Sequence, residues 1–187
     1  MSLTAQSRDQ FTNGINVTKL GEVIGAIQAN SELAQFKFRA QNDWHWGTQN
    51  EARISDFFGT SREVVHREPF SLGMDEPAVL LGADSAPNPV EVLLAALSGC
   101  MTSTLAYKAA AQGLPLDDVF SEFEGDIDLQ GFLELNPSSP IGYREIRVKF
   151  KVKGDGDEDT LRALLQTSPV YNSLVNPVKV TVEVEKL

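Results

Sequence analysis

The sequence has one cysteine, Cys100, and two histidines among its 187 residues. A single cysteine excludes an internal disulfide, and a reducing cytoplasm is the simplest compartment for such a chain. His45 and His66 do not stand at zinc-site spacing with that cysteine. The acidic cluster at residues 155–159 lacks the sixth-position glycine and the twelfth-position carboxylate of an EF-hand calcium loop. We therefore expect no metal ion and no cofactor.

Long apolar runs and basic stretches are also lacking. No segment approaches the roughly 18 consecutive apolar residues that span a bilayer, and no basic segment followed by an apolar run indicates a signal peptide. The formal net charge of −10 repels phosphate backbones and anionic membranes. We expect neither nucleic acid nor a membrane as a partner, which leaves a small molecule or another protein.

The rest of the composition is that of an ordinary globular protein. Hydrophobic residues make up 42% and charged residues 22% of the chain, close to average usage. The length suits one domain with a single core, and neither a repeat nor a linker divides it. We predict one α+β domain over residues 1–187, with a flexible polar stretch at residues 1–15.

The N-terminal half changes from a helical to a strand pattern. Apolar residues recur at helical spacing between Asn16 and Gln35, which predicts a helix. From Phe36 to Ala40 the apolar residues alternate with polar ones, as in a half-buried strand. Further strands are predicted near residues 51–58 and 64–72.

The clearest element is a helix from Asn88 to Gln112. Asn88 is a good N-cap, Pro89 suits the first helical position, and Glu91 completes a capping box. Gly113 is a typical C-terminal stop. Such a helix is on the order of 36 Å long.

The central part of this helix, residues 92–101, has almost no polar face. A helix that is apolar all round has to be buried on all sides. A chain of this size can hardly enclose such a helix alone, so we predict a partner subunit over part of it.

Two later stretches alternate charged with apolar residues. The first has acidic residues at every second position and the second has basic ones: Glu122, Glu124, Asp126 and Asp128, and Arg147, Lys149, Lys151 and Lys153. Paired antiparallel, the two strands would set an acidic row beside a basic row. Two solvated outer faces explain this pattern more simply than a functional patch does.

The C-terminal part is predicted to hold two short helices and a strand. One helix carries Leu161 and Leu165, and the next begins at Ser168-Pro169, where a capping residue precedes proline. Alternating valines predict a final strand with one buried face: Val178, Val180, Val182 and Val184.

Cys100 is the residue with the strongest claim to chemistry. A cysteine in an apolar helix is most often an inert core residue. A reactive thiol needs a positive charge or a hydrogen-bond donor nearby, because the thiolate is the nucleophile. Cys100 lies about 16 Å from the start of its helix, so the helix dipole contributes little. The hydroxyls of Ser103, Thr104 and Tyr107 share its face and could either donate to a thiolate or line a polar interface.

The segment 86–100, Ala-Pro-Asn-Pro-Val-Glu-Val-Leu-Leu-Ala-Ala-Leu-Ser-Gly-Cys, closely resembles the cysteine helix of the OsmC/Ohr family. Upstream, residues 75–77 (Asp-Glu-Pro) and 81–84 (Leu-Gly-Ala-Asp) look like the lead-in of its OsmC-like branch. Downstream, Ser168-Pro169-Val170-Tyr171 falls where the family has its second cysteine before a proline. The resemblance covers residues 36–187.

This resemblance implies an OsmC-like fold, with antiparallel sheets packed on a long central apolar helix in an intertwined homodimer. It also implies two sites at the subunit interface and a role in the response to peroxide stress. In peroxidase members, the cysteine that matches Cys100 attacks an organic hydroperoxide and becomes a sulfenic acid. The second cysteine then closes a disulfide that a dithiol reductant reopens, and a glutamate and an arginine assist.

The chain departs from that family pattern at the assisting positions. Ser168 replaces the second cysteine and cannot form a disulfide. Val90 stands where the family has its glutamate, and the adjacent Glu91 could reach the thiol only from a partner chain. Arg53 and Arg39 are available in the early strands, although neither lies in the family's glycine-rich arginine motif.

Two functions follow from these observations. In the first, Cys100 reduces a hydroperoxide by a one-cysteine cycle, and an external thiol resolves the sulfenic acid. In the second, the protein is a non-catalytic dimer that binds a small apolar ligand or a partner protein, and Cys100 is only packed. The rate of thiol alkylation against pH separates the two, because it distinguishes a thiolate from a buried thiol.

Overall fold

The computed structural model describes residues 9–176 and 178–186. The chain divides into two compact units, one of residues 1–11 and 16–93 and the other of residues 12–15 and 94–187. Two short strands, β1 (Phe11–Thr12) and β2 (Ile15–Asn16), pair near the N-terminus. Of the stretch for which the sequence predicts flexibility, residues 1–8 lie outside the described residues. That flexibility and the single domain stay predictions.

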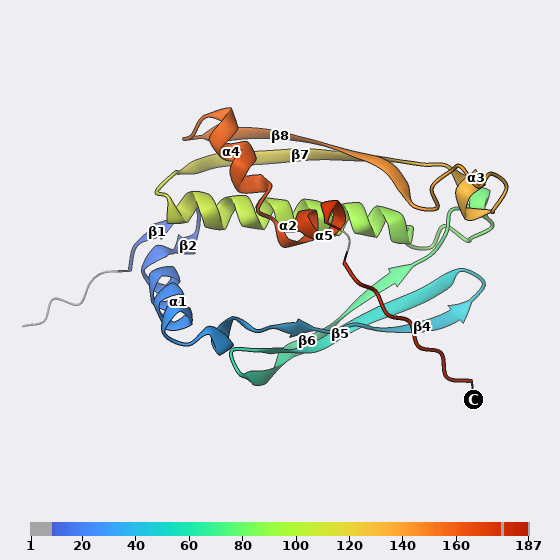
Figure 1. Cartoon of the computed structure of the whole chain (residues 1–187), viewed down its shortest axis with the longest axis horizontal. Helices are drawn as coiled ribbons and strands as arrows, with labels where there is room; N and C mark the ends of the chain where they lie inside the picture. The colour runs from blue at the N-terminus through green and yellow to red at the C-terminus, as the bar shows by residue number, and fades with distance from the viewer. Residues whose placement is uncertain (1–8, 177, 187) are drawn as a thin grey trace, which may run out of the picture. The chain divides into compact units, whose positions relative to one another are not determined.

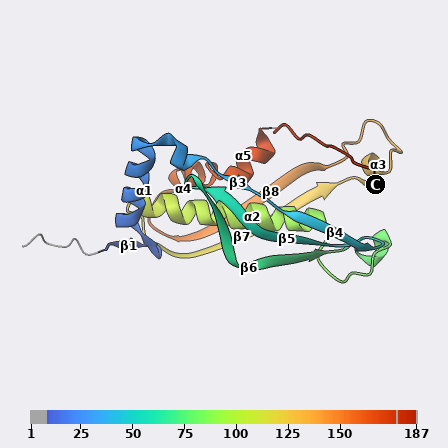
Figure 2. The ribbon, with the colours of Figure 1, turned by 90° about the horizontal axis from the view of Figure 1, so that it is seen from below.

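The first unit contains a helix and a four-stranded antiparallel sheet (Figure 1). Its elements are α1 (Val17–Ala29), η1 (Ser31–Ala34), β3 (Lys37–Phe38), β4 (Gln41–Trp46), β5 (Gln49–Gly59), β6 (Arg62–Met74) and η2 (Ala78–Leu80). β5 is central, because it pairs with β3 and β4 along one edge and with β6 along the other (Figure 2). The predicted helix is confirmed as α1, and the predicted strands near residues 51–58 and 64–72 are confirmed as β5 and β6.

The strand predicted at Phe36–Ala40 is much shorter than expected. Only Lys37 and Phe38 pair with β5, opposite Phe58 and Phe57. Phe36 adds to this corner through its ring, which stacks on those of Phe38 and Phe57 at centroid distances of 5.8 and 6.2 Å. Aromatic stacking therefore fixes a segment that has few backbone bonds of its own.

The connection between β6 and α2 is organised by a buried carboxylate. Asp75 is 1% exposed and accepts hydrogen bonds from the hydroxyls of Thr48, at 2.6 Å, and Ser85, at 2.8 Å. The backbone N–H groups of Glu76, Ala83 and Ser85 also donate to it. The Thr48 hydroxyl, followed by the Ser85 and backbone donors, holds the pKa of Asp75 well below its ordinary value near 3.8.

We expect Asp75→Asn to lower the melting temperature at neutral pH by about 5 °C or more, because an amide nitrogen cannot accept these hydrogen bonds. The lowered pKa also predicts a pH effect. The ionised group contributes stability above its unfolded pKa, and this contribution is lost as the pH falls through the lower folded pKa. Circular dichroism melts from neutral pH down to about pH 2 should show that acid-side loss in the wild type and less of it in the variant.

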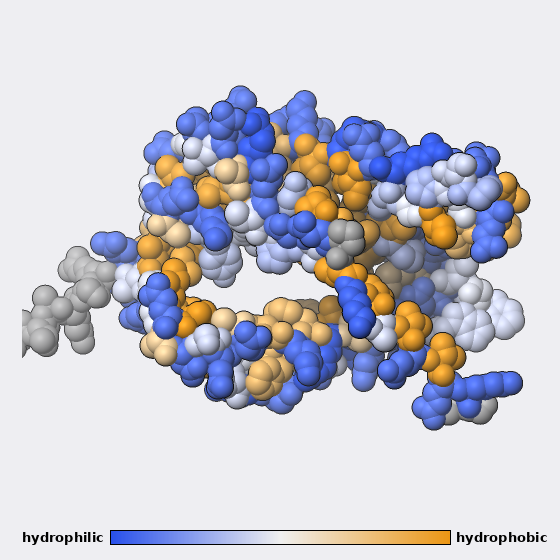
Figure 3. Space-filling model, in the orientation of Figure 1, coloured by the Kyte–Doolittle hydropathy of each residue, from blue (hydrophilic) through white to orange (hydrophobic). Residues whose placement is uncertain are grey.

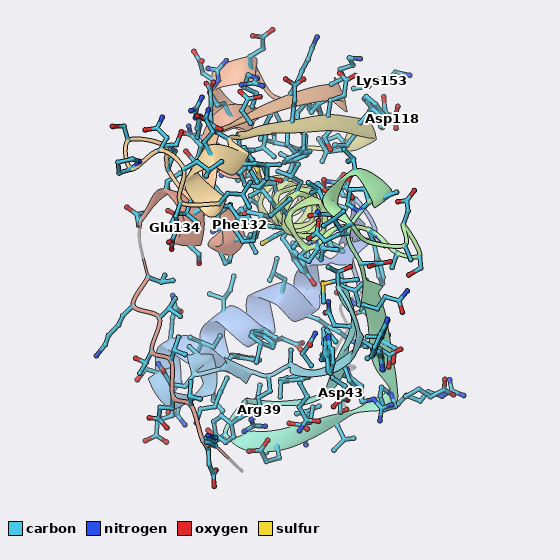
Figure 4. All side chains as sticks on the ribbon, turned by 90° about the vertical axis from the view of Figure 1, so that its right-hand side faces the viewer. Arg39, Asp43, Asp118, Phe132, Glu134 and Lys153 are labelled. Carbon is cyan, nitrogen blue, oxygen red and sulfur yellow. The ribbon has the colours of Figure 1, made fainter. Side chains whose placement is uncertain are left out.

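Asp43 supplies the matched control for this experiment. It is an exposed carboxylate of the same unit, on β4 (Figure 4). Asp43→Asn should leave both the melting temperature and its pH dependence unchanged. If Asp75→Asn behaves in the same way as Asp43→Asn, the hydrogen bonds to Asp75 do not stabilise the connection.

The second unit is built on α2 (Pro89–Ala111), whose first five residues belong to the first unit. Its other elements are β7 (Leu116–Ile127), α3 (Leu129–Phe132), β8 (Tyr143–Gly154), α4 (Glu158–Leu165) and α5 (Pro169–Val175). The predicted capping of α2 is confirmed: the Asn88 side chain accepts from Val90 N–H, and Glu91 accepts from Asn88 N–H at 2.9 Å. Gly113 ends the helix with a φ of +69°.

The core of the second unit lies along one stripe of α2. Leu97, Met101, Leu105 and Ala109 are buried together with Leu164 and Leu165 of α4. Apolar side chains of β7 and β8 pack against this stripe, among them Phe123, Ile146 and Phe150. Among the described residues, α2 is the one helix whose length and composition would suffice to cross a membrane. One stripe of it is buried in the second unit.

The predicted pairing of an acidic with a basic strand is confirmed in β7 and β8. Glu122 lies opposite Lys149, and Glu124 lies opposite Arg147. Arg147 also forms ion pairs with Asp126 and Glu145. Asp118 and Lys153 face each other at the end of the ladder (Figure 4). Hydrophilic side chains gather along the outer edge of the β7–β8 part of the unit, with hydrophobic ones below them (Figure 3).

The predicted C-terminal strand is wrong for the described chain. Residues 178–186 form no strand, and the four alternating valines are each at least 60% exposed. Hydrophobic and hydrophilic side chains follow one another along this C-terminal segment (Figure 3). The period-two pattern is present, but a strand also needs a neighbouring strand to pair with, and none pairs with this segment in the described residues.

Candidate functional site

The candidate site in the second unit is formed by Cys100 of α2 and Ser168 at the start of α5. Cys100 is half-buried and Ser168 is fully buried. The Ser168 hydroxyl donates a hydrogen bond to the Cys100 sulfur across 3.1 Å. Within the described part of the chain, Ser168 is the residue whose side chain bonds that sulfur.

Local structure orients the serine hydroxyl toward the sulfur. Ser168 is the N-cap of α5, and its Oγ accepts from the backbone N–H of Tyr171 at 3.3 Å. Pro169 occupies the first helical position, as the sequence predicts. Because the hydroxyl oxygen accepts from the helix, its single proton is directed to Cys100, and both capacities of a buried hydroxyl are used.

The three hydroxyls that share the face of Cys100 do not form this contact. Ser103 and Tyr107 are exposed, and Thr104 is half-buried. The exposed face of α2 runs through Ala96, Gly99, Ser103 and Tyr107, and Cys100 lies at its margin because successive helical residues turn by about 100°.

Of the two arginines named from the sequence, both in the first unit, Arg39 is engaged in ion pairs and Arg53 is exposed. Arg39 binds Glu63 through two nitrogens, at 2.8 and 2.9 Å, and Asp56 at 2.6 Å. These carboxylates raise the pKa of Arg39 above its ordinary value, with Glu63 as the larger cause, and Arg39 in turn lowers the pKa of Glu63. Arg53 is an exposed residue of β5, paired with Gln41. The assisting role of either arginine stays a prediction.

Glu91 is engaged in capping at the start of α2, and its assisting role from a partner chain likewise stays a prediction. Among the described residues, no cluster of three potential metal ligands occurs.

The second unit does have a groove of about 700 Å³ beside β8, α4 and α5. Apolar side chains such as Met101, Phe150 and Leu161 line it, and Lys149 and Lys151 contribute charge. Cys100 is not among its lining residues, so the groove and the thiol are separate features.

Comparison with known proteins bears on this site. The sequence model of the family described as OsmC-like protein matches residues 82–183, which is more than half of the chain. The chain belongs to the OsmC-like family. The resemblance seen in the sequence is thereby confirmed, and the matched range contains both Cys100 and Ser168. No curated protein matches the sequence.

Solved structures support the fold of this OsmC-like chain. An OsmC-like protein from Mycoplasma pneumoniae has a TM-score of 0.56 and 16% identity, covering 75% of this chain and 89% of that one. A protein from Psychrobacter arcticus, described as an osmotic stress induced and detoxification response protein, has a TM-score of 0.53 and 15% identity, covering 72% and 85%. The α+β fold with antiparallel sheets and a central helix is therefore confirmed.

A further similar structure is an organic hydroperoxide resistance protein, OsmC, from Legionella pneumophila. It has a TM-score of 0.48 and 18% identity, and the match covers 74% of this chain and 90% of that one.

The sequence indicates both residues of the site but not the bond between them. Cys100 stands out for its chemistry, and Ser168 stands out as the position of the family's second cysteine and as an N-cap. The N-cap is confirmed by the Tyr171 N–H bond. The family resemblance is the one signal for the contact with Cys100, since the two residues are 68 positions apart.

Proposed function

We propose that this OsmC-like protein reduces organic hydroperoxides through Cys100 by a one-cysteine cycle. The observation that carries the proposal is the sulfur of Cys100, half-buried on the helix of the matched family range and hydrogen-bonded by Ser168 at 3.1 Å. A thiol that is partly accessible and has a hydrogen-bond donor is suited to act as a thiolate nucleophile. The Psychrobacter arcticus neighbour, described as a detoxification response protein, is in keeping with this role.

The proposed cycle balances with an external thiol as reductant. The Cys100 thiolate attacks the terminal peroxide oxygen, an S–O bond forms and the O–O bond breaks, and the leaving alkoxide takes a proton to become an alcohol. The sulfenic acid then reacts with an external thiol to give a mixed disulfide and water. A second thiol group, from the same dithiol or from another molecule, releases Cys100 and is itself oxidised.

The test is steady-state consumption of cumene hydroperoxide with a dithiol as reductant. We expect turnover that continues well beyond one equivalent of peroxide per chain, with oxidised dithiol and alcohol formed in equal amounts. If Cys100 is not oxidised even at millimolar peroxide, the enzymatic function is ruled out.

The alternative is a non-catalytic OsmC-like protein that binds a small apolar ligand or a partner. The groove beside β8, with a volume of about 700 Å³ and a lining of both apolar and charged side chains, favours it as a second candidate. In that case Cys100→Ala leaves the binding of an apolar fluorescent probe intact, and iodoacetamide modifies the wild-type thiol slowly. Rapid alkylation near pH 6 would contradict this alternative.

We further propose that the protein acts as a homodimer in a reducing cytoplasm. Three exposed apolar features support a second copy: the α2 face at Ala96, Gly99 and Tyr107, the aromatic corner at Phe36 and Phe38, and the valines of residues 178–184. Large exposed apolar surfaces are typical of interfaces between subunits.

Sedimentation tests the homodimer directly. We expect a species of twice the 20.4 kDa chain mass. A Cβ added at Gly99 would meet open space, so Gly99→Arg fits the single chain but should dissociate a dimer that packs on this face. Gly21→Arg, at an equally open position of α1, is the control and should stay dimeric. A stable 20.4 kDa wild-type species would contradict the proposal.

A further inference from the structure

The hydrogen bond from Ser168 is the polar contact that the sulfur of Cys100 makes in the part of the chain that the structure describes. The donor is fully buried and is held in place by its second bond, from Tyr171 N–H. Its position therefore does not depend on a mobile side chain. A donor fixed in this way stabilises the charged form of the group that it faces.

The helix dipole and Arg39 are two other candidate sources of thiol activation. Cys100 is near the middle of α2, where the helix dipole has little effect. Arg39, one of the two arginines named from the sequence, already binds the carboxylates of Glu63 and Asp56. The serine hydroxyl, by contrast, is in direct contact with the sulfur.

We infer that Ser168 is a catalytic residue, whose hydroxyl stabilises the Cys100 thiolate before attack and the sulfenate after it. The inference rests on the proposed hydroperoxide reduction. Because a hydroxyl forms no disulfide with sulfur, the sulfenic acid stays on Cys100 until an external thiol reaches it. Ser168 thus has two effects. Its hydroxyl activates the nucleophile, and because it is not a thiol, an external thiol has to resolve the sulfenic acid.

The test measures the rate of Cys100 alkylation by iodoacetamide against pH. In Ser168→Ala we expect the alkylation rate at neutral pH to fall about tenfold, since a hydrogen bond to a charged group is worth about a factor of ten. An alkylation curve that superimposes on that of the wild type would overturn the inference.

A matched variant separates this effect from the loss of a helix cap. Asp157 caps α4 through Thr160 N–H, at 2.7 Å, in the same unit. Asp157→Ala should destabilise the protein to a degree similar to Ser168→Ala, because each removes an N-cap, and yet it should leave the alkylation curve unchanged. If both variants shift the curve equally, Ser168 acts through stability alone and the inference fails.

Ser168→Cys tests the geometry independently. A sulfur at this position, starting from a 3.1 Å contact, should close a disulfide with Cys100 after one equivalent of hydroperoxide or of diamide. Intact mass should show the loss of two hydrogen atoms. A disulfide with diamide but not with hydroperoxide refutes the proposed function and leaves the Ser168 contact intact. No disulfide with either oxidant, in a variant that circular dichroism shows to be folded, refutes the contact.

Discussion

Hydroperoxide consumption should fall at least about a thousandfold in Cys100→Ser. An unactivated hydroxyl does not attack a peroxide oxygen, and the sequence has no other cysteine to replace Cys100. Serine is close in size to cysteine, so the contact with Ser168 and the packing of α2 should persist. The expected result is peroxide loss at the rate of buffer with dithiol alone, measured by a ferrous oxidation assay. The melting temperature should stay close to that of the wild type.

Ser103→Ala is the matched control for the Cys100 variant. Ser103 lies on the same helix three residues on, is exposed, and does not bond the sulfur. It should retain the wild-type rate. Residual dithiol-dependent turnover in Cys100→Ser at more than a few per cent would place the chemistry elsewhere in the protein.

Leu105→Ala is expected to have the largest effect on stability. Leu105 is 0% exposed at the centre of the stripe that packs against β7, β8 and α4. Deleting its side chain removes buried apolar surface and leaves a cavity, which costs about 2–5 kcal/mol of unfolding free energy. Urea unfolding followed by circular dichroism should show a lower midpoint with a similar slope.

Leu135 provides the corresponding control, since it is 71% exposed in the same unit. Leu135→Ala removes the same atoms from the surface and should change the unfolding free energy by less than about 0.5 kcal/mol. Equal midpoints for the two leucine variants would mean that the α2 stripe is not the core of this unit.

The helix ends that are predicted correctly, in α2 and at the start of α5, carry local chemical signals. Asn88 and Glu91 begin α2 through reciprocal hydrogen bonds, and Gly113 ends it with a positive φ. Ser168 followed by Pro169 begins α5, where the Ser168 side chain accepts from Tyr171 N–H. Such signals depend on a few adjacent residues, so they can be recognised in the sequence alone.

The strands are predicted less well, because a strand depends on its neighbour. The sequence does not predict β4: its residues, Gln-Asn-Asp-Trp-His-Trp, include only two apolar ones and several types that strands disfavour. It forms because β5 lies beside it and supplies the ladder. The C-terminal valines show the opposite case, in which alternation without a partner gives no strand in the described chain.

The residues of the candidate site can be predicted from the sequence, but the contact between them cannot. Chemistry and the family resemblance together select Cys100 and Ser168. Their 3.1 Å contact depends on how α5 packs beside α2, which no local pattern encodes. The ion pairs of Arg39 could not be predicted either, because they depend on the register of β5, which carries Asp56, and β6, which carries Glu63.

The mass of the protein after one equivalent of cumene hydroperoxide tests the reactivity of Cys100 most directly. We expect the gain of a single oxygen atom on Cys100, trapped by dimedone, and its conversion to a mixed disulfide when a small monothiol is added. Cys100 that keeps its mass and its free thiol after exposure to millimolar peroxide would contradict the central claim that this sulfur is a reactive nucleophile.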